Sequence, residues 1–535
     1  MGEVKLLDCT LRDGGYVNDW NFGHNNLVSI FERLVDAGID IIEIGFLDER
    51  RPFDINRSIM PDTDSVFNIY GDLDKKNSII VGMIDYGTCS LANIRPCNES
   101  YLDGIRVIFK KHLMIPAMEF CNELKKKGYL VFAQLVSVTS YSDQEMLKLI
   151  DLANEIEPYA VSMVDTYGLM HQDNLLHYFE LLNHNLKPSI GIGYHAHNNF
   201  QMGYANCIAL LSQKFDRTVV VDGTIYGMGK SAGNAPIELI AMHMNHALNK
   251  KYHISQILEA IDSNITQFYQ AATWGYNMFY YLAASNDCHP NYVTYYMNKR
   301  TLSVKSINEI LGKLQGEKKL LYDKEYAESL YKEYQLNEVN DENDLKRIKN
   351  ELKDKEILLI GPGNSVHSQK EKIEEYLLEK NPVVISINYI PEDIKTDYVF
   401  LSNSKRYVQV ATRLCKCSSK IIATSNITAT SQNAFDYILN YSTLIDNNAE
   451  IIDNSLIMLL KALVLIKIKN VALAGFDGYS SNNTNYFNKS MEYEFVKKMA
   501  NYLNEYTVHF IRSVSNKITV KFVTDSKYVD GLNNE

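Results

Sequence analysis

Two histidines separated by a single residue are the strongest candidates for chemistry in this sequence. They are His195 and His197 in the segment GYHAHNN, which follows an apolar run predicted to be a strand. Side chains at positions i and i+2 of a strand point to the same face, so both imidazoles can reach one ion. We therefore predict a divalent-metal site. Mn2+ or Mg2+ is expected first, with Zn2+, Co2+ or Fe2+ as alternatives that the sequence does not separate.

Two further polar segments have the composition of ligand-binding loops. The segment CTLRDGG places Arg12 and Asp13 after the first predicted strand, where the following glycines let the backbone approach a ligand. The alternative to a ligand-binding role for Arg12 and Asp13 is an ordinary ion pair on the protein surface. The segment DGTIYGMGKSAGNAP is a Gly-rich loop that contains Asn234. It lacks the GxGxxG spacing and does not follow a first strand, which argues against a dinucleotide loop.

The elements that would position these residues alternate between short β-branched runs and amphipathic stretches of helix length. This alternation is typical of βα units around a parallel sheet. The candidate strands are Val4–Leu11, Ile39–Ile44, Ser78–Met83, Gly104–Phe109, Leu130–Val136, Ala160–Val164, Ser189–Tyr194 and Thr218–Val221. Eight parallel strands close a (β/α)8 TIM barrel, with the functional loops at their carboxyl ends. The seventh, eighth and first strands are then neighbours, so Asp13, His195, His197 and Asn234 should face one another.

The helix candidates are Asn25–Asp36, Leu113–Lys127, Asp143–Glu155 and Phe200–Ser212. Gly38 and Gly128 then fall where helices end, which is a common position for glycine.

After the barrel, the alternation of short β-branched runs and helix-length stretches ends, and this change sets the predicted domain boundaries. Residues 1–250 form the barrel, and residues 251–322 form a Tyr-rich helical appendage. Residues 323–355 form a charged helical connector. Residues 356–535 form a smaller open α/β domain, Rossmann-like, in which Ile451–Val464 is expected to be buried structure.

Composition and charge restrict the partners. The chain has 535 residues, a net charge of -11 and 22% charged residues, values of a globular acidic protein that does not bind nucleic acid through its phosphates. We expect neither a signal peptide nor a membrane span, and eight scattered cysteines favour a cytoplasmic protein. The apolar excess of the Tyr-rich appendage predicts a homo-oligomer.

The motifs CTLRDGG, GYHAHNN and GMGKSAGNAP, in this order over residues 1–250, resemble those of the DRE-TIM metallolyase superfamily. That superfamily includes 4-hydroxy-2-oxovalerate aldolases, hydroxymethylglutaryl-CoA (HMG-CoA) lyases, and isopropylmalate and homocitrate synthases. The resemblance implies that Asp13, His195 and His197 hold the metal with Asn234 at or near it. It also implies that Arg12 stabilises the developing enolate oxygen.

Other positions of the resemblance imply contacts to substrate. Glu43, Asp165 and Thr166 lie at the predicted rim, although a buried structural role is an equal alternative for Glu43. Pyruvate-forming aldolases of the superfamily usually carry a histidine three residues after the motif aspartate, where this chain has Tyr16. We expect Tyr16 or a metal-bound water to handle the hydroxyl proton, although the ordinary pKa of tyrosine, near ~10, makes it a poor base.

The resemblance predicts an aldolase or carbon–carbon lyase that acts on a 2-oxoacid of the pyruvate type and an aldehyde. A Claisen-type synthase that uses an acyl-CoA is one alternative. The other alternative is a glycan-assembly protein whose last domain binds or transfers a nucleotide-activated sugar.

That last alternative depends on the final domain, where LLIGPGNSV and VALAGFDGYS loosely resemble nucleotide-sugar-binding domains of sialyltransferase-like and flagellin-glycosylation accessory proteins. A Gly-rich turn before a helix can bind phosphate through its N–H groups, but it is also a common strand-to-helix connection. The predicted contacts are Gly361, Gly363, Asn364, Ser365 and Asp477.

Overall fold

The computed structural model describes residues 2–299, 302–319, 321–336, 338–414, 416–427, 435–446, 449–488, 491–492 and 494–533. The chain forms two compact units, Met1–Pro290 and Asn291–Glu535. The division falls within the segment expected to be a helical appendage. Each unit is described by itself below.

The first unit is a closed barrel of eight parallel strands. In sheet order its strands are β1 (Val4–Asp8), β9 (Val219–Gly223), β8 (Gly191–Ala196), β7 (Ala160–Asp165), β6 (Leu130–Leu135), β5 (Gly104–Phe109), β4 (Ile79–Asp85) and β2 (Ile41–Leu47). Pairing of β1 with β2 closes the sheet, and the short β3 (Ile59–Met60) adds to β2. The predicted barrel is confirmed, because eight apolar runs that are buried on both faces can pair in one parallel ring.

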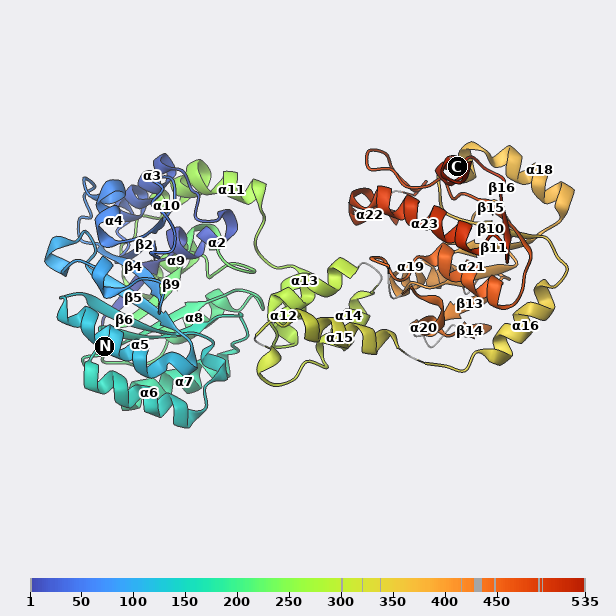
Figure 1. Cartoon of the computed structure of the whole chain (residues 1–535). Helices are drawn as coiled ribbons and strands as arrows, with labels where there is room; N and C mark the ends of the chain where they lie inside the picture. The colour runs from blue at the N-terminus through green and yellow to red at the C-terminus, as the bar shows by residue number, and fades with distance from the viewer. Residues whose placement is uncertain are drawn as a thin grey trace. The chain divides into compact units, whose positions relative to one another are not determined.

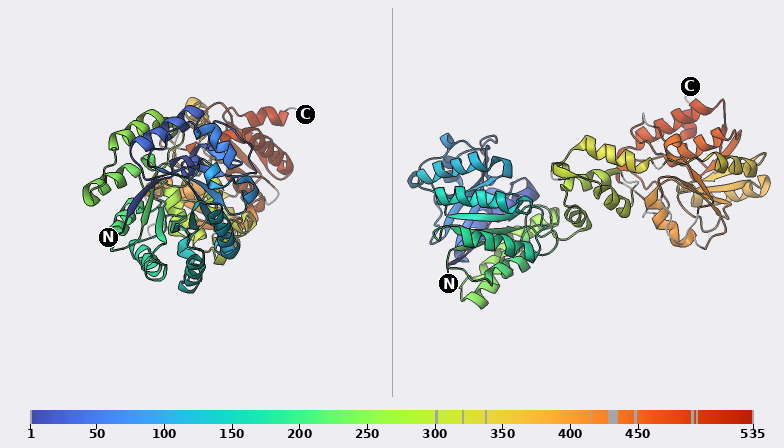
Figure 2. Two further views of the ribbon diagram at one scale, coloured as in Figure 1. Left: turned by 90° about the vertical axis from the view of Figure 1, so that its left-hand side faces the viewer. Right: turned by 90° about the horizontal axis from the view of Figure 1, so that it is seen from below.

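Helices surround the strands of the barrel (Figures 1 and 2). They are α3 (His24–Asp36), α4 (Thr63–Tyr70), α5 (Met114–Lys126), α6 (Asp143–Ile156), α7 (Gln172–Asn185), α8 (Gly203–Leu211) and α9 (Ile237–Leu248). After them come α10 (Ile254–Ala260), which packs on α3 and α9, then α11 (Thr266–Ala271) and α12 (Met278–Ser285). Helix α3 buries Leu27, Ile30, Phe31 and Leu34, a spacing that follows one face of a helix. Gly38 and Gly128 follow α3 and α5 with positive φ angles of 76° and 95°, which confirms them at the helix ends.

One layer of the barrel interior is apolar, and buried polar residues such as Arg106 and Gln134 follow it toward the carboxyl ends of the strands. Leu7, Ile41, Val81, Phe132 and Val220 form one buried cluster inside the ring. Such a filled interior leaves the loops at the strand ends as the place for chemistry.

The second unit contains an open sheet of seven parallel strands. Their order is β14 (Tyr437–Leu439), β13 (Lys420–Thr424), β12 (Tyr398–Leu401), β11 (Val383–Ile387), β10 (Ile357–Ile360), β15 (Asn470–Ala474) and β16 (Thr519–Phe522). The sequence did not predict β14, which has three residues, or β16, which lacks the buried apolar run of the central strands. The order reverses between β10 and β15, the arrangement of a doubly wound α/β fold.

Both faces of this sheet are covered, since alternate residues of β10 enter different cores. Leu359 packs with α16 (Glu342–Leu352), α21 (Ser455–Leu465) and α23 (Ala500–Val514), whereas Leu358 packs with α18 (Lys370–Lys380). Helix α19 (Ser404–Leu414) covers β12 and β13. The apolar stretch Ile451–Val464 contributes most of α21, as buried structure.

The remaining helices of the second unit are α13 (Pro290–Lys299), α14 (Val304–Leu311), α15 (Lys324–Gln335), α17 (Ser365–Ser368), α20 (Tyr441–Leu444), α22 (Glu494–Lys498) and α24 (Lys527–Asn533). Among the residues described, no helix has the length and apolar character needed to cross a membrane.

Candidate metal centre

The first strand ends earlier than predicted, and this changes how Arg12 and Asp13 are held. Strand β1 stops at Asp8, and Thr10–Asp13 form the single helical turn α1. The Asp8 carboxylate accepts hydrogen bonds from the Thr10 backbone N–H and hydroxyl, at 2.9 and 2.7 Å. A side chain that accepts backbone hydrogen bonds in this way begins a helical turn and ends the strand. Arg12 and Asp13 therefore lie on a turn above the strand end.

The structure brings Asp13, His195 and His197 together. Nε2 of His195 lies 3.3 Å from Oδ2 of Asp13, and Nε2 of His197 lies 3.6 Å from Oδ1. One ligand atom from each of the three side chains lies within 4.8 Å of the other two. All three residues are buried, with at most 4% of their surface exposed. The sequence prediction that these side chains converge is therefore fulfilled by the geometry.

Each imidazole is oriented from its other ring nitrogen. Nδ1 of His195 lies 3.0 Å from Oδ2 of Asp222, and Nδ1 of His197 lies 2.9 Å from the backbone oxygen of Asp165. Both partners accept hydrogen bonds, so the ring protons belong on Nδ1. Within the described structure, Nε2 of neither histidine forms a hydrogen bond. Two lone pairs consequently point toward Asp13, the arrangement of metal-binding histidines.

Asn234 lies beside this cluster. It forms an isolated antiparallel β-bridge with His197, and among the described residues neither polar atom of its buried amide has a partner. A Cβ added at Gly229 would come 2.7 Å from Asn234 Nδ2 and 2.8 Å from Asp13 Oδ1. The glycine therefore leaves space between two candidate ligands. Orphaned buried atoms and this space fit a bound divalent cation.

Electrostatics favour the metal-binding protonation states of Asp13 and His197, whereas the carboxylates beside His195 make that imidazole more basic. Burial alone would raise the pKa of Asp13, but the charges of Arg12 and His197 hold it well below its usual range. Burial lowers the pKa of His197, and burial would also lower that of His195, but the neighbouring carboxylates of Asp13 and Asp222 outweigh it and raise the pKa of His195. The cluster thus offers a carboxylate and a neutral imidazole, which are metal-binding forms.

Arg12 is fixed by carboxylates on two sides. Its Nε donates to Glu43 Oε2 at 2.8 Å, and its Nη1 donates to Asp13. Glu43 is fully buried and also lies 3.1 Å from Nη1 of Arg106. This position favours a role for Glu43 in orienting Arg12 over a contact to substrate. Nη2 of Arg12 makes no hydrogen bond in the described part of the chain.

Sequence reasoning missed Arg106 and Asp222, which complete the buried network. Arg106 is 1% exposed on β5 and donates to Asp222 and, at 3.1 Å, to Gln134. Asp222 therefore joins a buried arginine to His195. The available signal was one charged residue inside the apolar run GIRVIF, since a buried charge must find a partner.

Cys9 forms a second group of metal-ligand type with His195 and Asp222. Its Sγ lies 3.8 Å from Nδ1 of His195, and burial raises the pKa of the thiol well above its usual range. The second group would use His195 Nδ1, which is already directed to Asp222, whereas the Nε2 atoms that face Asp13 have no partner among the described residues. The group that includes Asp13 is therefore the better cation site.

Tyr16 lies at the edge of the cluster and remains 45% exposed. The Tyr16 ring packs edge-on against Trp20, with 4.9 Å between the two ring centroids. Lys230 Nζ lies 5.4 Å from the centroid of the Tyr16 ring. Desolvation by neighbouring atoms and the charge of Asp13 raise the pKa of Tyr16 to about 12. Lys230 comes from the Gly-rich loop, where its backbone N–H donates to Asp13 Oδ1 at 2.8 Å. No carboxylate of the described residues lies within salt-bridge distance of its ammonium group.

Asp165 ends strand β7 and Thr166 directly follows it, and neither belongs to the converging ligand atoms. The Asp165 carboxylate accepts from the N–H groups of Leu169 and Met170 at 2.8 and 3.1 Å, and burial raises its pKa to about 6. Thr166 Oγ1 accepts from Ser137 N at 2.8 Å. Both residues shape the loops around the cluster, and their contact with substrate stays a prediction.

The predicted nucleotide contacts of the second unit surround the end of β10. Asp477 accepts hydrogen bonds from the Ser365 N–H, at 2.9 Å, and from the Ser365 hydroxyl. Asn364 Nδ2 donates to the Thr484 backbone oxygen at 2.7 Å. Gly361 and Gly363 lie against the Gly475 carbonyl, where an added Cβ would come 2.7 and 2.5 Å from its oxygen. These residues are together in space, while their binding of a nucleotide stays a prediction.

Comparison with known proteins covers the barrel half of the chain. Residues 114–264 match the HMGL-like family model. A 4-hydroxy-2-oxovalerate aldolase from Marinomonas sp. (strain MWYL1) is 25% identical over 248 residues, which cover 45% of this chain and 71% of that protein. A 2-isopropylmalate synthase from Sulfolobus acidocaldarius is 23% identical over 249 residues, which cover 46% and 63%. Among solved structures, the HMG-CoA lyase from Bacillus subtilis matches with a TM-score of 0.40 and 17% identity, over 50% of this chain and 93% of that chain.

The first unit is a closed parallel barrel with an Asp–His–His cluster, a candidate metal centre, at the carboxyl ends of its strands. The family match and the aldolase relatives support the DRE-TIM metallolyase superfamily for this barrel. The resemblance stated from the motifs is thereby confirmed for the barrel. The resemblance of the second unit to sugar-transfer proteins stays a prediction.

Proposed function

We propose that the barrel is a divalent-metal-dependent aldolase that makes or breaks a carbon–carbon bond in a 4-hydroxy-2-oxoacid. The single observation that carries this proposal is the convergence of Asp13, His195 and His197 with both Nε2 atoms unpartnered among the described residues. The aldolase relatives support the class of reaction.

These three side chains, with Asn234 beside them, would hold the cation. When bound, the cation would supply Lewis acidity, which polarises the 2-oxo group of a substrate. The identity of the metal, with Mn2+ or Mg2+ expected first, is part of the proposal.

Arg12 has the position to stabilise negative charge that develops on the substrate. In the cleavage direction the 4-hydroxyl loses a proton and the C3–C4 bond breaks, releasing an aldehyde. The electron pair of that bond moves onto the 2-oxo oxygen, and protonation at C3 then gives the pyruvate-type product. Because Glu43 and Asp13 fix the guanidinium, Nη2 can donate to this oxygen with little reorganisation.

Tyr16 and Lys230 are proposed to act at the other end of the substrate. Tyr16 is exposed, and with its pKa raised to about 12 it is a neutral phenol at pH 7. We assign it a hydrogen bond to the 4-oxygen of the substrate, while the 4-hydroxyl proton leaves to solvent. Lys230 lies over the Tyr16 ring and would pair with an acidic group of the substrate.

A direct assay tests this function. Purified protein is incubated with 4-hydroxy-2-oxopentanoate, and pyruvate is measured before and after exhaustive chelation and after re-addition of Mn2+ or Mg2+. Pyruvate release that chelation abolishes and metal restores is expected. Activity that is retained by the metal-free protein would contradict the proposal.

The relationship to a 2-isopropylmalate synthase favours one second candidate, a Claisen-type condensation of an acyl-CoA with a 2-oxoacid. Release of free thiol from acetyl-CoA in the presence of 2-oxoacids identifies that reaction. Pyruvate release in the absence of CoA would exclude the Claisen-type condensation as the explanation of the activity.

A further inference from the structure

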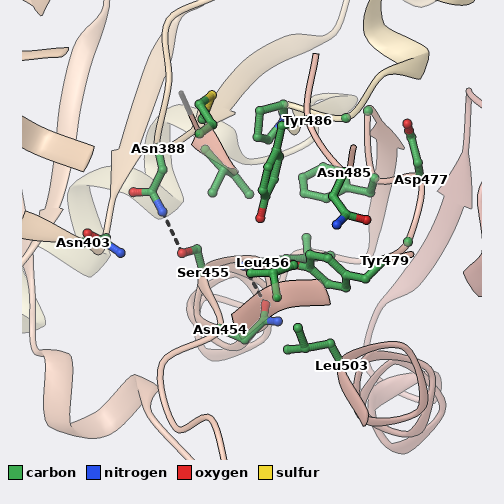
Figure 3. Close-up of a pocket in the computed structure, with 18 of the residues that line it drawn as sticks. Asn388, Asn403, Asn454, Ser455, Leu456, Asp477, Tyr479, Asn485, Tyr486 and Leu503 are labelled. Atoms are coloured by element: carbon green, nitrogen blue, oxygen red, sulfur yellow. Dashed lines mark hydrogen bonds between the residues drawn. The ribbon is translucent and has the colours of Figure 1, made fainter. Parts of the chain in front are cut away.

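The second unit contains a cavity of about 150 Å³ at the carboxyl ends of its central strands (Figure 3). Residues that follow β10, β11, β12 and β15 line it, together with the start of α21. The cavity therefore lies where the strand order reverses, which is where doubly wound sheets bind ligands. The chemistry proposed for the barrel does not use this cavity, so a ligand bound here would be independent of the proposed aldolase reaction.

The Gly-rich loop beside this cavity already holds a negative charge from the protein. The Asp477 carboxylate accepts from the Ser365 N–H at 2.9 Å and from the Ser365 hydroxyl. A Cβ added at Gly363 would lie 2.6 Å from Asp477 Oδ1, so the loop backbone closes tightly onto the carboxylate. A phosphate at this position would have to displace Asp477 or approach it against charge repulsion. The loop thus disfavours an anionic group.

Two asparagines at the cavity use their side-chain oxygens to cap helices and leave their side-chain nitrogens as donors. Asn403 Oδ1 accepts from the N–H groups of Lys405 and Arg406 at 3.0 and 3.2 Å, at the start of α19. Asn454 Oδ1 likewise caps α21 by accepting from Leu456 and Ile457. Because each oxygen faces its helix, each Nδ2 faces away, and among the described residues neither Nδ2 makes a hydrogen bond. Both amides lie around the cavity in Figure 3.

The other walls combine aromatic rings with acceptors. Tyr479 and Tyr486 line the cavity, with Phe476 nearby. Asp477 also lines the cavity, and although both of its oxygens accept from Ser365, a carboxylate oxygen can accept a second hydrogen bond from a ligand hydroxyl. Arg406, which lies over the Tyr486 ring, and Asp453 also line the cavity, so its charged residues include both signs. Amide donors, a carboxylate acceptor and aromatic faces in one small cavity suit a neutral ring with several hydroxyl groups.

We propose that this cavity is a binding site for a neutral, hydroxylated ring of monosaccharide size. The Nδ2 atoms of Asn403 and Asn454 donate to ring hydroxyls, Asp477 accepts from one, and the tyrosine rings cover the apolar C–H face. The Asp477–Ser365 contact excludes a phosphate from the adjacent loop.

Saturation-transfer NMR on the full-length protein tests the proposal with four probes: D-glucose, D-galactose, D-mannose and N-acetyl-D-glucosamine. The test variant is Asn403→Asp with Asn454→Asp, because aspartate keeps both capping oxygens and removes both donors. Asn277→Asp is the matched control, since it makes the same change at the exposed N-cap of α12 in the barrel unit. We expect transfer to at least one sugar, retained in the control and weakened about tenfold in the double variant, as two lost hydrogen bonds imply.

Three results would overturn this assignment. One is the absence of transfer to all four sugars, and another is undiminished transfer in a folded double variant. The third is displacement of the sugar by excess pyrophosphate, which would return the loop to phosphate binding. Uridine is included as a further probe, and binding of uridine without any sugar would assign the cavity to a heteroaromatic base and reject the hydroxylated ring.

Discussion

Asp222 Oδ2 lies 3.0 Å from His195 Nδ1 and also accepts a hydrogen bond from Arg106, so one carboxylate joins a buried cation to a candidate metal ligand. An ionised carboxylate only accepts hydrogen bonds, and it therefore fixes the His195 proton on Nδ1 and leaves Nε2 for an ion. The burial of Asp222, Arg106 and His195 makes this arrangement depend on all three.

Replacing Asp222 by asparagine should weaken metal binding. The amide can present its NH2 group to His195 and no longer fixes the ring proton, and loss of such a partner typically costs about 10- to 100-fold in metal affinity. Competition with a chromophoric chelator measures the dissociation constant. Asp143→Asn, at an exposed aspartate that pairs with His177, is the matched control and should leave affinity unchanged. Equal affinities in a folded Asp222→Asn protein would exclude the orienting role.

Removing both candidate imidazoles should remove the metal. In the double variant His195→Ala and His197→Ala only Asp13 and Asn234 remain, too few protein ligands for tight binding of a divalent ion. Plasma mass spectrometry should find near-stoichiometric metal in the wild type and little in the variant. The exposed pair His177→Ala and His184→Ala on α7 controls for loss of surface histidines and should retain the metal. Metal retained in the first variant would place the ion elsewhere.

Arg12→Lys should reduce turnover and leave metal binding nearly intact. A lysine keeps the positive charge but cannot span Glu43 and Asp13 while presenting a further N–H, because it lacks the planar fork of arginine. Loss of one fixed donor to a developing oxyanion typically lowers kcat about 100-fold. Pyruvate release under saturating substrate measures kcat, and metal content measured on the same sample separates catalysis from binding. A kcat equal to that of the wild type would show that Arg12 does not act on the reacting oxygen.

The second unit should lose a specific stabilising contact in acid. Glu351 on α16 accepts hydrogen bonds from Lys420 Nζ and the Tyr437 hydroxyl, each at 2.7 Å, and from the Tyr398 hydroxyl. Burial alone would raise the pKa of Glu351, but these hydrogen bonds lower it to about 2. A carboxyl group whose pKa is lower when folded stabilises the fold above its unfolded pKa. That stabilisation is lost as the pH falls toward the folded value.

Glu351→Gln should therefore unfold at lower urea concentration than the wild type at pH 7, with a difference that shrinks between about pH 4.5 and pH 2. The signal comes from tyrosine-sensitive near-UV circular dichroism. Glu356→Gln, at an exposed position just before β10, serves as the control. A difference in urea midpoint that does not change with pH would rule out this ionic contribution.

The predicted and observed folds agree most closely where local periodicity carries the information. Eight apolar runs, separated by helix-length segments, sufficed for the barrel, and the spacing of Leu27, Ile30, Phe31 and Leu34 sufficed for α3. The end of β1 was placed three residues too late, at Leu11 instead of Asp8. Apolar residues continue past the strand, and the Asp8 side chain that ends it acts through hydrogen bonds.

The sequence by itself determined the barrel, its order of strands and the two histidines of the candidate centre, because strand periodicity fixes which side chains share a face. Only the tertiary structure decided that Arg106 and Asp222 orient this centre and that Asp477 closes onto Ser365. Arg106 and Asp222 are 116 residues apart in sequence, and Ser365 and Asp477 are 112 apart. The physical reason is that a charge removed from water needs a partner, and the chain brings these distant partners together only when each parallel sheet assembles.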